Sequence, residues 1–211
     1  TMAVAEGRVG PQTANDGATL IERMLRDGSV AVADAHSRYL ELTARKQIFS
    51  GAIVGQVTSV ALATTYTGLC LSNPIGSGQL LVLNKLGYGF LVAFAAAAAV
   101  GLMVGYHAST DVVHTTPVIP RNNFIGGAAG VGKLDSACTL PVAPTVQQIL
   151  ESGLTGAITT APSGGAGFFD NEGSLIIPPG GFVAYYTSTA SGAAGSAFSF
   201  QWSEVPIGMA T

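Results

Sequence analysis

Seven residues in the second half of the chain have the spacing of a phosphate-binding loop. Gly127–Lys133 matches G-x-x-x-x-G-K, in which backbone N–H groups of a glycine-rich loop surround phosphate oxygens. That chemistry also requires a Ser or Thr next, to hold Mg²⁺, with a strand before the loop and a helix after it. Here Leu134 follows the lysine, and the polar residues 121–123 precede the loop. We therefore interpret the motif as a loop in a chain rich in Gly and Ala, and predict no nucleotide site.

Three side chains of metal-binding type follow a little earlier, at His107, Asp111 and His114. Imidazole and carboxylate groups are ordinary ligands for zinc. The first two fall at the end of an expected strand and the third falls in the next loop, where no fixed geometry is implied. We predict polar residues at a strand end, and no metal site.

Two carboxylates, Asp170 and Glu172, stand two positions apart. On a strand they would share one face, and paired carboxylates can hydrolyse glycosides. Their turn-like surroundings, Phe168–Gly173, favour a solvated loop instead. Residues 53–106 contain no His, Asp or Glu, so the expected sheets lack a converging catalytic set. We predict that the chain is not an enzyme and uses no cofactor and no small-molecule substrate.

Charge is distributed unevenly along the chain, and this pattern indicates where the elements that position these residues begin. Lys85 is the single formal charge between Gln47 and Thr110, whereas the first 50 residues carry 12 of the 21 charges. Such an uncharged stretch implies a membrane span, a buried core, or burial against other protein. The net charge of −3 gives no electrostatic footprint for nucleic acid, so no nucleic-acid partner is predicted.

The uncharged run Phe90–Tyr106 is at the lower limit of length for a transmembrane helix. Gly101 and Gly105 interrupt it, and no cluster of Lys or Arg flanks it. We therefore predict no membrane span, and instead two strands near Gln79–Phe94 and Val100–Ser109, joined or bent at the alanines.

Residues 1–50 are interpreted as an arm that lies over a neighbouring surface. Asn15 or Asp16 can cap a short helix that extends through Arg26. The charged segment His36–Lys46 has the composition of either a helix or a strand. The arm is not expected to contribute to the core of the domain that follows.

Residues 51–211 are rich in short β-forming segments separated by Gly and Pro. Asn73–Gly78 predicts a turn, Thr115–Gly132 a long loop, and Thr145–Gly153 a short helix with a capping box. Cys70 is expected to be a buried free thiol. The predicted strands are Ile53–Thr64, Thr67–Ser72, Gln79–Leu86, Gly89–Phe94, Val100–Ser109, Ser136–Leu140, Ser174–Ile177, Phe182–Thr189 and Ala197–Pro206.

The aromatic residues of the last two strands could form either a core or a carbohydrate platform. Phe198, Phe200 and Trp202 alternate with polar residues, and this period of two indicates a strand with one buried face. Core packing is therefore the favoured interpretation, also for Tyr185 and Tyr186. The predicted fold is all-β, a jelly-roll-like β-sandwich over residues 51–211 with an extended N-terminal arm carrying a short helix.

Several of these segments resemble a known family, the jelly-roll head decoration (cement) proteins of tailed bacteriophages. None of the similar segments contains a catalytic signature. The closing strands of that family are similar to Ser174–Gly180, Phe182–Tyr185 and Phe198–Pro206, its early strand–turn–strand to Leu69–Pro74, Gly76–Gly78 and Leu80–Leu83, and its arm to His36–Leu42.

The resemblance implies a homo-oligomeric jelly roll on the exterior of an icosahedral capsid, made in the host cytoplasm. There it would clamp adjacent subunits of the major capsid protein, with its extended N-terminus along the lattice and no catalytic residues. A homotrimer is favoured and a homodimer is possible. The alternative is a glycan- or receptor-binding jelly-roll protein of a head fibre or tail tip. The candidate capsid or oligomer contacts are Arg23, Arg26, Arg38, Tyr39, Glu41, Arg45 and Phe49.

Overall fold

The computed structural model describes residues 38–57, 59–91, 94, 97–154, 166–189 and 195–207. The predicted helix that ends at Arg26 lies outside these residues, as does most of the predicted arm. The chain divides into two compact units, Thr1–Glu41 and Leu42–Thr211. Strand β1 begins at Ile48, so residues 48–50 of the predicted arm belong to a sheet of the second unit.

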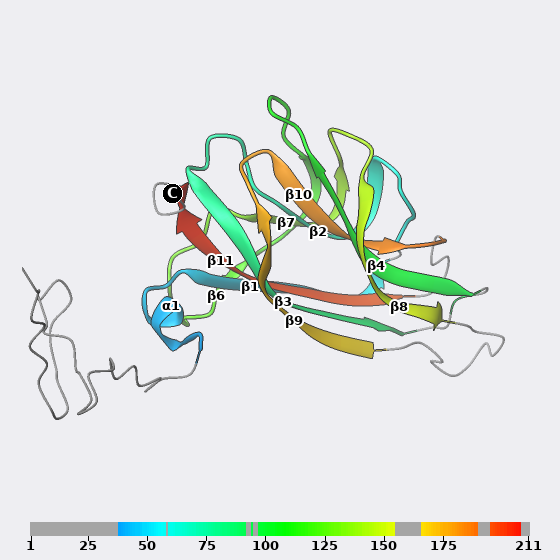
Figure 1. The fold of residues 1–211 in the computed structure, drawn as a ribbon, viewed down its shortest axis with the longest axis horizontal. Coiled ribbons are helices and arrows are strands. Elements are labelled where there is room, and N and C mark those ends of the chain that lie inside the picture. Colours follow the sequence, from blue (N-terminus) through cyan, green and yellow to red (C-terminus); the bar gives the residue numbers. More distant parts are fainter. Residues whose placement is uncertain are drawn as a thin grey trace, which may run out of the picture. The chain divides into compact units, whose positions relative to one another are not determined.

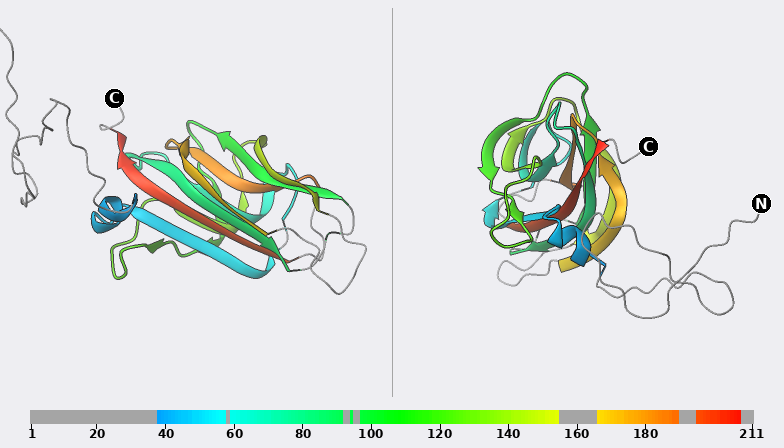
Figure 2. Two further views of the ribbon diagram at one scale, coloured as in Figure 1. Left: turned by 60° about the horizontal axis from the view of Figure 1, so that its bottom comes forward. Right: turned by 90° about the vertical axis from the view of Figure 1, so that its left-hand side faces the viewer.

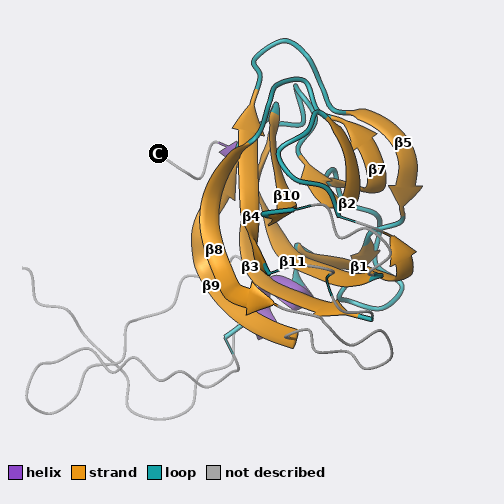
Figure 3. Cartoon of the chain, turned by 90° about the vertical axis from the view of Figure 1, so that its right-hand side faces the viewer, coloured by secondary structure: helices purple, strands orange, loops and turns teal. Residues whose placement is uncertain are grey.

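Two antiparallel sheets account for most of the second unit (Figure 1). One has the strand order β6-β1-β11-β3-β9 and the other β5-β7-β2-β10-β4-β8. Figure 3 shows the two sheets facing each other as layers of a sandwich. The elements are α1 (Leu40–Ala44), β1 (Ile48–Val57), β2 (Thr65–Ser72), β3 (Gln79–Phe90), β4 (Ala98–Tyr106), β5 (Val113–Val118), β6 (Arg121–Asn122), β7 (Lys133–Thr139), β8 (Thr145–Leu154), β9 (Ala166–Ile177), β10 (Gly181–Thr187) and β11 (Ser196–Pro206).

Four strand pairs identify the sandwich as a jelly roll. The first four strands pair in order with the last four in reverse: β1 with β11, β2 with β10, β3 with β9, and β4 with β8. A chain that folds back on itself and then rolls up produces this pairing, and the two sheets become β1-β11-β3-β9 and β2-β10-β4-β8. Figure 2 shows β1 running alongside β11. The predicted fold class is confirmed.

Three further strands form an insertion between β4 and β8. β7 extends the second sheet beside β2, β5 pairs with β7, and β6 pairs with β1 of the first sheet. The prediction of a continuous loop over residues 115–132 is therefore wrong, because β5 and β6 lie within it. Pro117 suggested a loop, but a proline is tolerated in β5 because this strand is at the edge of its sheet.

Two other local predictions are also wrong. The capping-box residues from Thr145 onward begin strand β8 and not a helix, because pairing with β4 outweighs a weak helical preference. Asp170 and Glu172 lie within strand β9 and not in a solvated loop. A positive φ at Glu172 (50°) and at Gly173 (78°) gives this strand a local irregularity that resembles a turn in the sequence.

The core between the sheets is rich in aromatic side chains. Phe198, Phe200 and Trp202 are buried and face it, which confirms the period of two in the last strand. The Tyr185 ring stacks between those of Phe198 and Phe200, at centroid distances of 4.1 and 4.8 Å. Phe94, from the uncharged run, is also buried there, between the ends of β3 and β4. In the described residues, no helix has the length and apolar character needed to cross a membrane.

A second buried cluster lies on the other face of the second sheet. In β10, Val183 and Tyr185 face the main core, whereas Phe182 and Ala184 face this second cluster. Cys70 and Cys138 belong to the second cluster as buried free thiols, as predicted for Cys70. The three central strands of the second sheet, β2, β10 and β4, are thus buried on both faces, which explains why they carry no charges.

Candidate interaction surface

The glycine-rich loop that resembles a phosphate site binds an internal carboxylate. The backbone N–H groups of Val131 and Gly132 each donate to Glu204 of β11, over 2.9 Å. The indole Nε1 of Trp202 donates to the same carboxylate over 3.2 Å. Glu204 is only 7% exposed, so its charge is balanced by these donors and not by water. Two N–H groups of the apparent phosphate cradle are therefore already occupied.

The glycines of this motif allow the loop to approach β11 closely. A Cβ atom added at Gly130 would lie 2.3 Å from Glu204 Oε1, and one at Gly132 would lie 2.9 Å from Trp202 Nε1. Strand β7 follows the loop, starting at Lys133, where a phosphate loop would be followed by a helix. The motif therefore serves the fold, by covering the edge of the core at Trp202.

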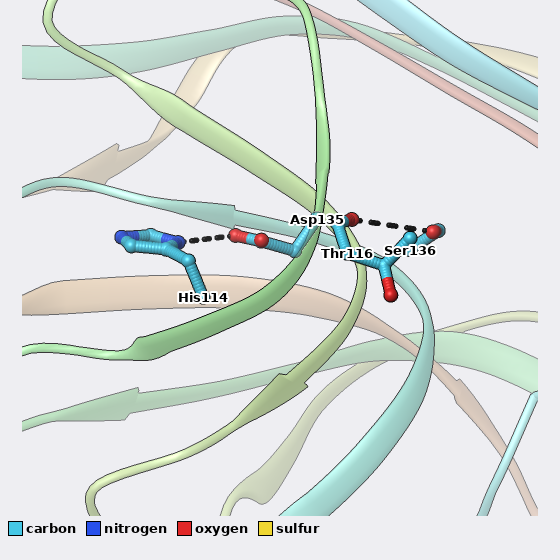
Figure 4. A network of polar contacts seen from close by, with 4 residues as sticks. All are labelled: His114, Thr116, Asp135 and Ser136. Atoms are coloured by element: carbon cyan, nitrogen blue, oxygen red, sulfur yellow. Dashed lines mark hydrogen bonds and ion pairs between the residues drawn. The ribbon is translucent and has the colours of Figure 1, made fainter.

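The three candidate metal ligands have separate roles. Asp111 Oδ1 accepts a hydrogen bond from the backbone N–H of Ile75, and His107 Nδ1 accepts one from Ser109 N. His114 Nδ1 lies 2.5 Å from Asp135 Oδ2 (Figure 4). No group of three or more His, Cys, Asp or Glu in the described residues is arranged to hold a metal ion.

The His114–Asp135 pair is an unusual polar contact beside the second cluster. The Asp135 side chain is completely buried, whereas that of His114 is 34% exposed. Asp135 Oδ1 has no hydrogen-bond partner among the described residues. Burial raises the pKa of the Asp135 carboxyl, and the hydrogen bond and charge of His114 oppose part of this rise.

The two carboxylates of β9 do not form a catalytic pair. Asp170 Oδ1 accepts a hydrogen bond from the backbone N–H of Glu172 over 3.0 Å, which supports the irregularity in the strand. Lys85 of β3 is directly opposite Asp170 in the register. Asp170 therefore supports the local conformation of β9 and is paired in the register with a lysine, whereas a catalytic pair would place a second carboxylate across a substrate.

Of the first four candidate contacts in the arm, two lie outside the described residues and two lie within them. Arg23 and Arg26 lie outside the described residues. The Arg38 guanidinium lies 5.6 Å from the centre of the Tyr39 ring, a cation–π distance. Their role as contacts with other subunits stays a prediction.

The other three candidates lie closer to the sandwich in sequence. Glu41, in α1, and Arg45, just after it, are both exposed. Phe49 is 4% exposed, and its ring stacks on that of Trp202 at 6.1 Å. Phe49 thus contributes to the core of the sandwich and is not available at its surface.

The edge strands β5, β6, β8 and β9 are poorly suited to pairing with another strand. β6 has two residues, and β5 contains Pro117. β9 carries Asp170 and Glu172 with a local irregularity, and β8 has three register shifts against β4. Short strands, proline, charge and bulges all discourage edge-to-edge association. Contacts with other proteins are therefore expected through loops and sheet faces.

A loop after β6, residues 122–127, presents apolar side chains to solvent and is termed the tip loop. Ile125 is 95% exposed, the highest value among the large apolar side chains of the described residues. Phe124 beside it and Ile119 before β6 are also exposed. An apolar cluster of this kind on a loop is a typical feature of a binding surface. The sequence signal is Phe-Ile beside Gly126, within the segment that the sequence predicts as a long loop.

Hydrogen bonds within the tip loop fix its conformation. Asn122 Nδ2 donates to the carbonyls of Lys46 (2.8 Å) and Ala128 (3.2 Å), and Asn122 Oδ1 accepts from Phe124 N (2.8 Å). Gly127 N donates to the Phe124 carbonyl over 2.8 Å, closing a turn. The exposed side chains are therefore carried on an ordered backbone.

The tip loop is also attached to β1. Asn123 N donates to the Ile48 carbonyl over 2.8 Å, and Ser50 Oγ donates to Asn123 Oδ1 over 2.6 Å. Lys46 Nζ lies 5.1 Å from the centre of the Phe124 ring. These contacts come from the start of the sandwich, so they fix the position of the loop beside the first sheet.

Among the described residues, the polar motifs that suggested chemistry are used by the fold: Glu204 holds the glycine-rich loop, and Asp170 supports β9. The tip loop is an ordered apolar feature that these residues do not bury. Comparison with family models, curated proteins and solved structures finds no match to this chain.

Proposed function

We propose that the chain is a capsid decoration, or cement, protein, a structural virion component on the outer surface of an icosahedral head. It clamps adjacent subunits of the major capsid protein and also contacts copies of itself, with a homotrimer favoured. The tip loop is the observation that carries this proposal. The resemblance of the closing strands to the decoration family and the jelly-roll fold support it.

The tip loop has the properties of a protein-docking element. Burying a side chain such as Ile125 in a partner pocket contributes about 1.5–3 kcal/mol. Because hydrogen bonds already order the loop, little conformational entropy is lost on binding. A pair of apolar side chains on an ordered loop is thus sufficient for a small energetic centre within a larger interface.

The rest of the sandwich suits attachment to an assembled shell. Its blunted edges favour defined contacts over open-ended strand pairing. Its net charge of −3 suits the exterior of a capsid better than the surface that faces packaged DNA. A protein that binds the assembled shell and not its separate parts stabilises the shell by mass action.

The test is incorporation into purified phage heads. Mass spectrometry of virions should find the chain at a fixed copy ratio to the major capsid protein, and its absence from virions would refute the proposal. Heads that lack the chain should bind the added wild-type protein. The Ile125→Ser variant should bind about 10- to 100-fold more weakly, the factor that corresponds to losing the burial of one isoleucine.

Ile176→Ser provides a matched control, because Ile176 is also an exposed isoleucine but lies on β9. This variant should bind heads as the wild type does. Equal binding by the Ile125 variant and the wild type would show that the tip loop is not the docking element.

A further inference from the structure

The outer face of the first sheet carries a row of polar side chains that runs across four strands. Ser50 of β1 is opposite Gln201 of β11, Gln201 is opposite Lys85 of β3, and Lys85 is opposite Asp170 of β9. Directly opposed residues in a sheet point to the same face. Lys85 and Asp170 are the charges of this row and have opposite signs, so the row is neutral overall.

The neighbouring row consists of residues with small side chains or none and ends in an aromatic ring. Ala52, Ser199, Gly87 and Phe168 are opposite one another in the same order of strands. The first three have small side chains or none, whereas Phe168 is 69% exposed. A Cβ atom added at Gly87 would lie 2.8 Å from Ser199 Oγ and in ordinary contact, 3.6 Å, with Phe168 Cδ2, so the lack of a side chain here serves the close approach of Ser199.

Two open depressions follow these rows and share Ser199. One, of about 280 Å³, is lined by Ser50, Lys85, Phe168, Ser199, Phe200 and Gln201. The other, of about 320 Å³, continues along the strands past Ala52, Gly87 and Gly89 towards Val54. Rows on one face of a sheet are about 7 Å apart, so the two depressions form one shallow groove along the strands.

We propose that this groove binds a neutral saccharide. A pyranose ring has an apolar C–H face and a rim of hydroxyl groups. Phe168 offers its exposed ring for the first, with Lys85 Nζ 5.6 Å from the ring centre, and the adjacent polar row offers hydrogen-bonding groups for the second.

One acceptor of the polar row is without a partner in the part of the chain that the structure describes. Gln201 Oε1 is buried and has no hydrogen-bond partner among the described residues. Gln201 lines the groove, so a turn of its side chain would bring this acceptor within reach of a sugar hydroxyl bound there. Because Lys85 is opposite Asp170, the groove has no excess charge that would favour an anionic ligand.

The site is shallow and has no pair of carboxylates placed across it, so it binds and does not cleave. The two sites share Ser50, whose Oγ donates to Asn123 of the tip loop, but the residues that are tested in each, Phe168 and Ile125, are separate. Loss of one is therefore expected to leave the other intact, and the two proposals fail independently.

Affinity electrophoresis of the full chain tests the proposal, in native gels that contain a neutral polysaccharide (dextran, laminarin, mannan or galactan) or acidic alginate. At least one neutral polysaccharide should retard the wild-type protein. Phe168→Ala should weaken that binding about tenfold or more, since it removes the stacking surface. Phe168→Tyr should retain binding, because the ring remains.

Two further variants separate loss of the site from loss of the fold. Ala52→Leu leaves Phe168 in place but fills the groove, so it should also weaken binding. Tyr106→Ala removes an exposed aromatic residue of β4, in the other sheet, and should bind as the wild type does. The proposal is overturned if no neutral polysaccharide retards the protein, if alginate alone does so, or if Phe168→Ala and Tyr106→Ala are retarded equally.

Discussion

The carboxylate of Glu204 makes the strongest prediction about what holds this fold together. Its Oε1 accepts from Gly132 N and Trp202 Nε1, and its Oε2 accepts from Val131 N. Glu204→Gln keeps the size of the side chain but replaces one acceptor oxygen with an NH₂ donor. If the amide oxygen takes the place of Oε1, which accepts two hydrogen bonds, the new NH₂ group takes the place of Oε2. It then faces the N–H group of Val131, and two donors oppose each other.

The expected cost follows from these contacts. Leaving one buried N–H without an acceptor costs about 1–3 kcal/mol. The other two hydrogen bonds lose their ionic acceptor, and charge-assisted bonds contribute more than neutral ones. Together these effects should lower the free energy of unfolding by about 2–4 kcal/mol.

Urea denaturation measures this change directly, and Trp202 reports on it because it is the single tryptophan of the chain. With a urea dependence of about 1–3 kcal/mol per molar, the unfolding midpoint should fall by roughly 1–2 M. Glu172→Gln is the matched control, since Glu172 is exposed on β9, and it should change stability by less than about 0.5 kcal/mol. A loss below about 1 kcal/mol for Glu204→Gln would refute the assignment of Glu204 as the anchor of the loop.

Two other predictions concern the second sheet. Because burial raises the pKa of Asp135 above the ordinary value of 3.8, the folded state binds this proton more tightly than the unfolded chain. The contribution of Asp135 to stability is therefore complete below pH 3.8 and is lost as the pH rises through the raised pKa. In urea titrations, Asp135→Asn should therefore gain stability relative to the wild type between acid and neutral pH. A difference in stability that does not change with pH would contradict this. Gly101→Ala should lower the melting temperature severely, since its Cβ atom would lie 2.1 Å from the Gln148 backbone carbonyl oxygen. Gly89→Ala is the control and should be tolerated in thermal melts, because the nearest neighbour of its Cβ atom would lie at 3.8 Å. Equal melting temperatures for the two variants would show that β4 and β8 can separate locally.

Local patterns in the sequence predicted the elements whose cause is local. The alternation of Phe198, Phe200 and Trp202 requires only that one face of β11 be buried. The residues that pair β4 with β8 carry no such local signal, and the capping-box letters at Thr145 indicated a helix. The partner of β8 in the sheet had to be known before its conformation could be predicted.

For the candidate site too, the sequence predicted features that depend on neighbouring residues and did not predict contacts between residues far apart in the chain. The glycine-rich loop was recognised from its spacing, but its partner Glu204 is 72 residues away from Gly132. Nothing near Glu204 in the sequence distinguishes it from an exposed acid. The groove on the first sheet was missed for a related reason, because Ser50, Lys85 and Gln201 become neighbours only through the strand register.

The long uncharged stretch around Lys85 has two different explanations in the two sheets. In the second sheet, clusters of buried side chains cover both faces of the central strands, so charges would be costly there. The described residues leave the outer face of the first sheet open, yet Ala52, Gly87, Gly89, Ala197 and Ser199 carry no charge on that face. Burial among the described residues does not explain that composition, because a solvated sheet face usually carries charged side chains. The proposed saccharide ligand would account for it, and for the placement of Lys85 opposite Asp170 at the end of the groove.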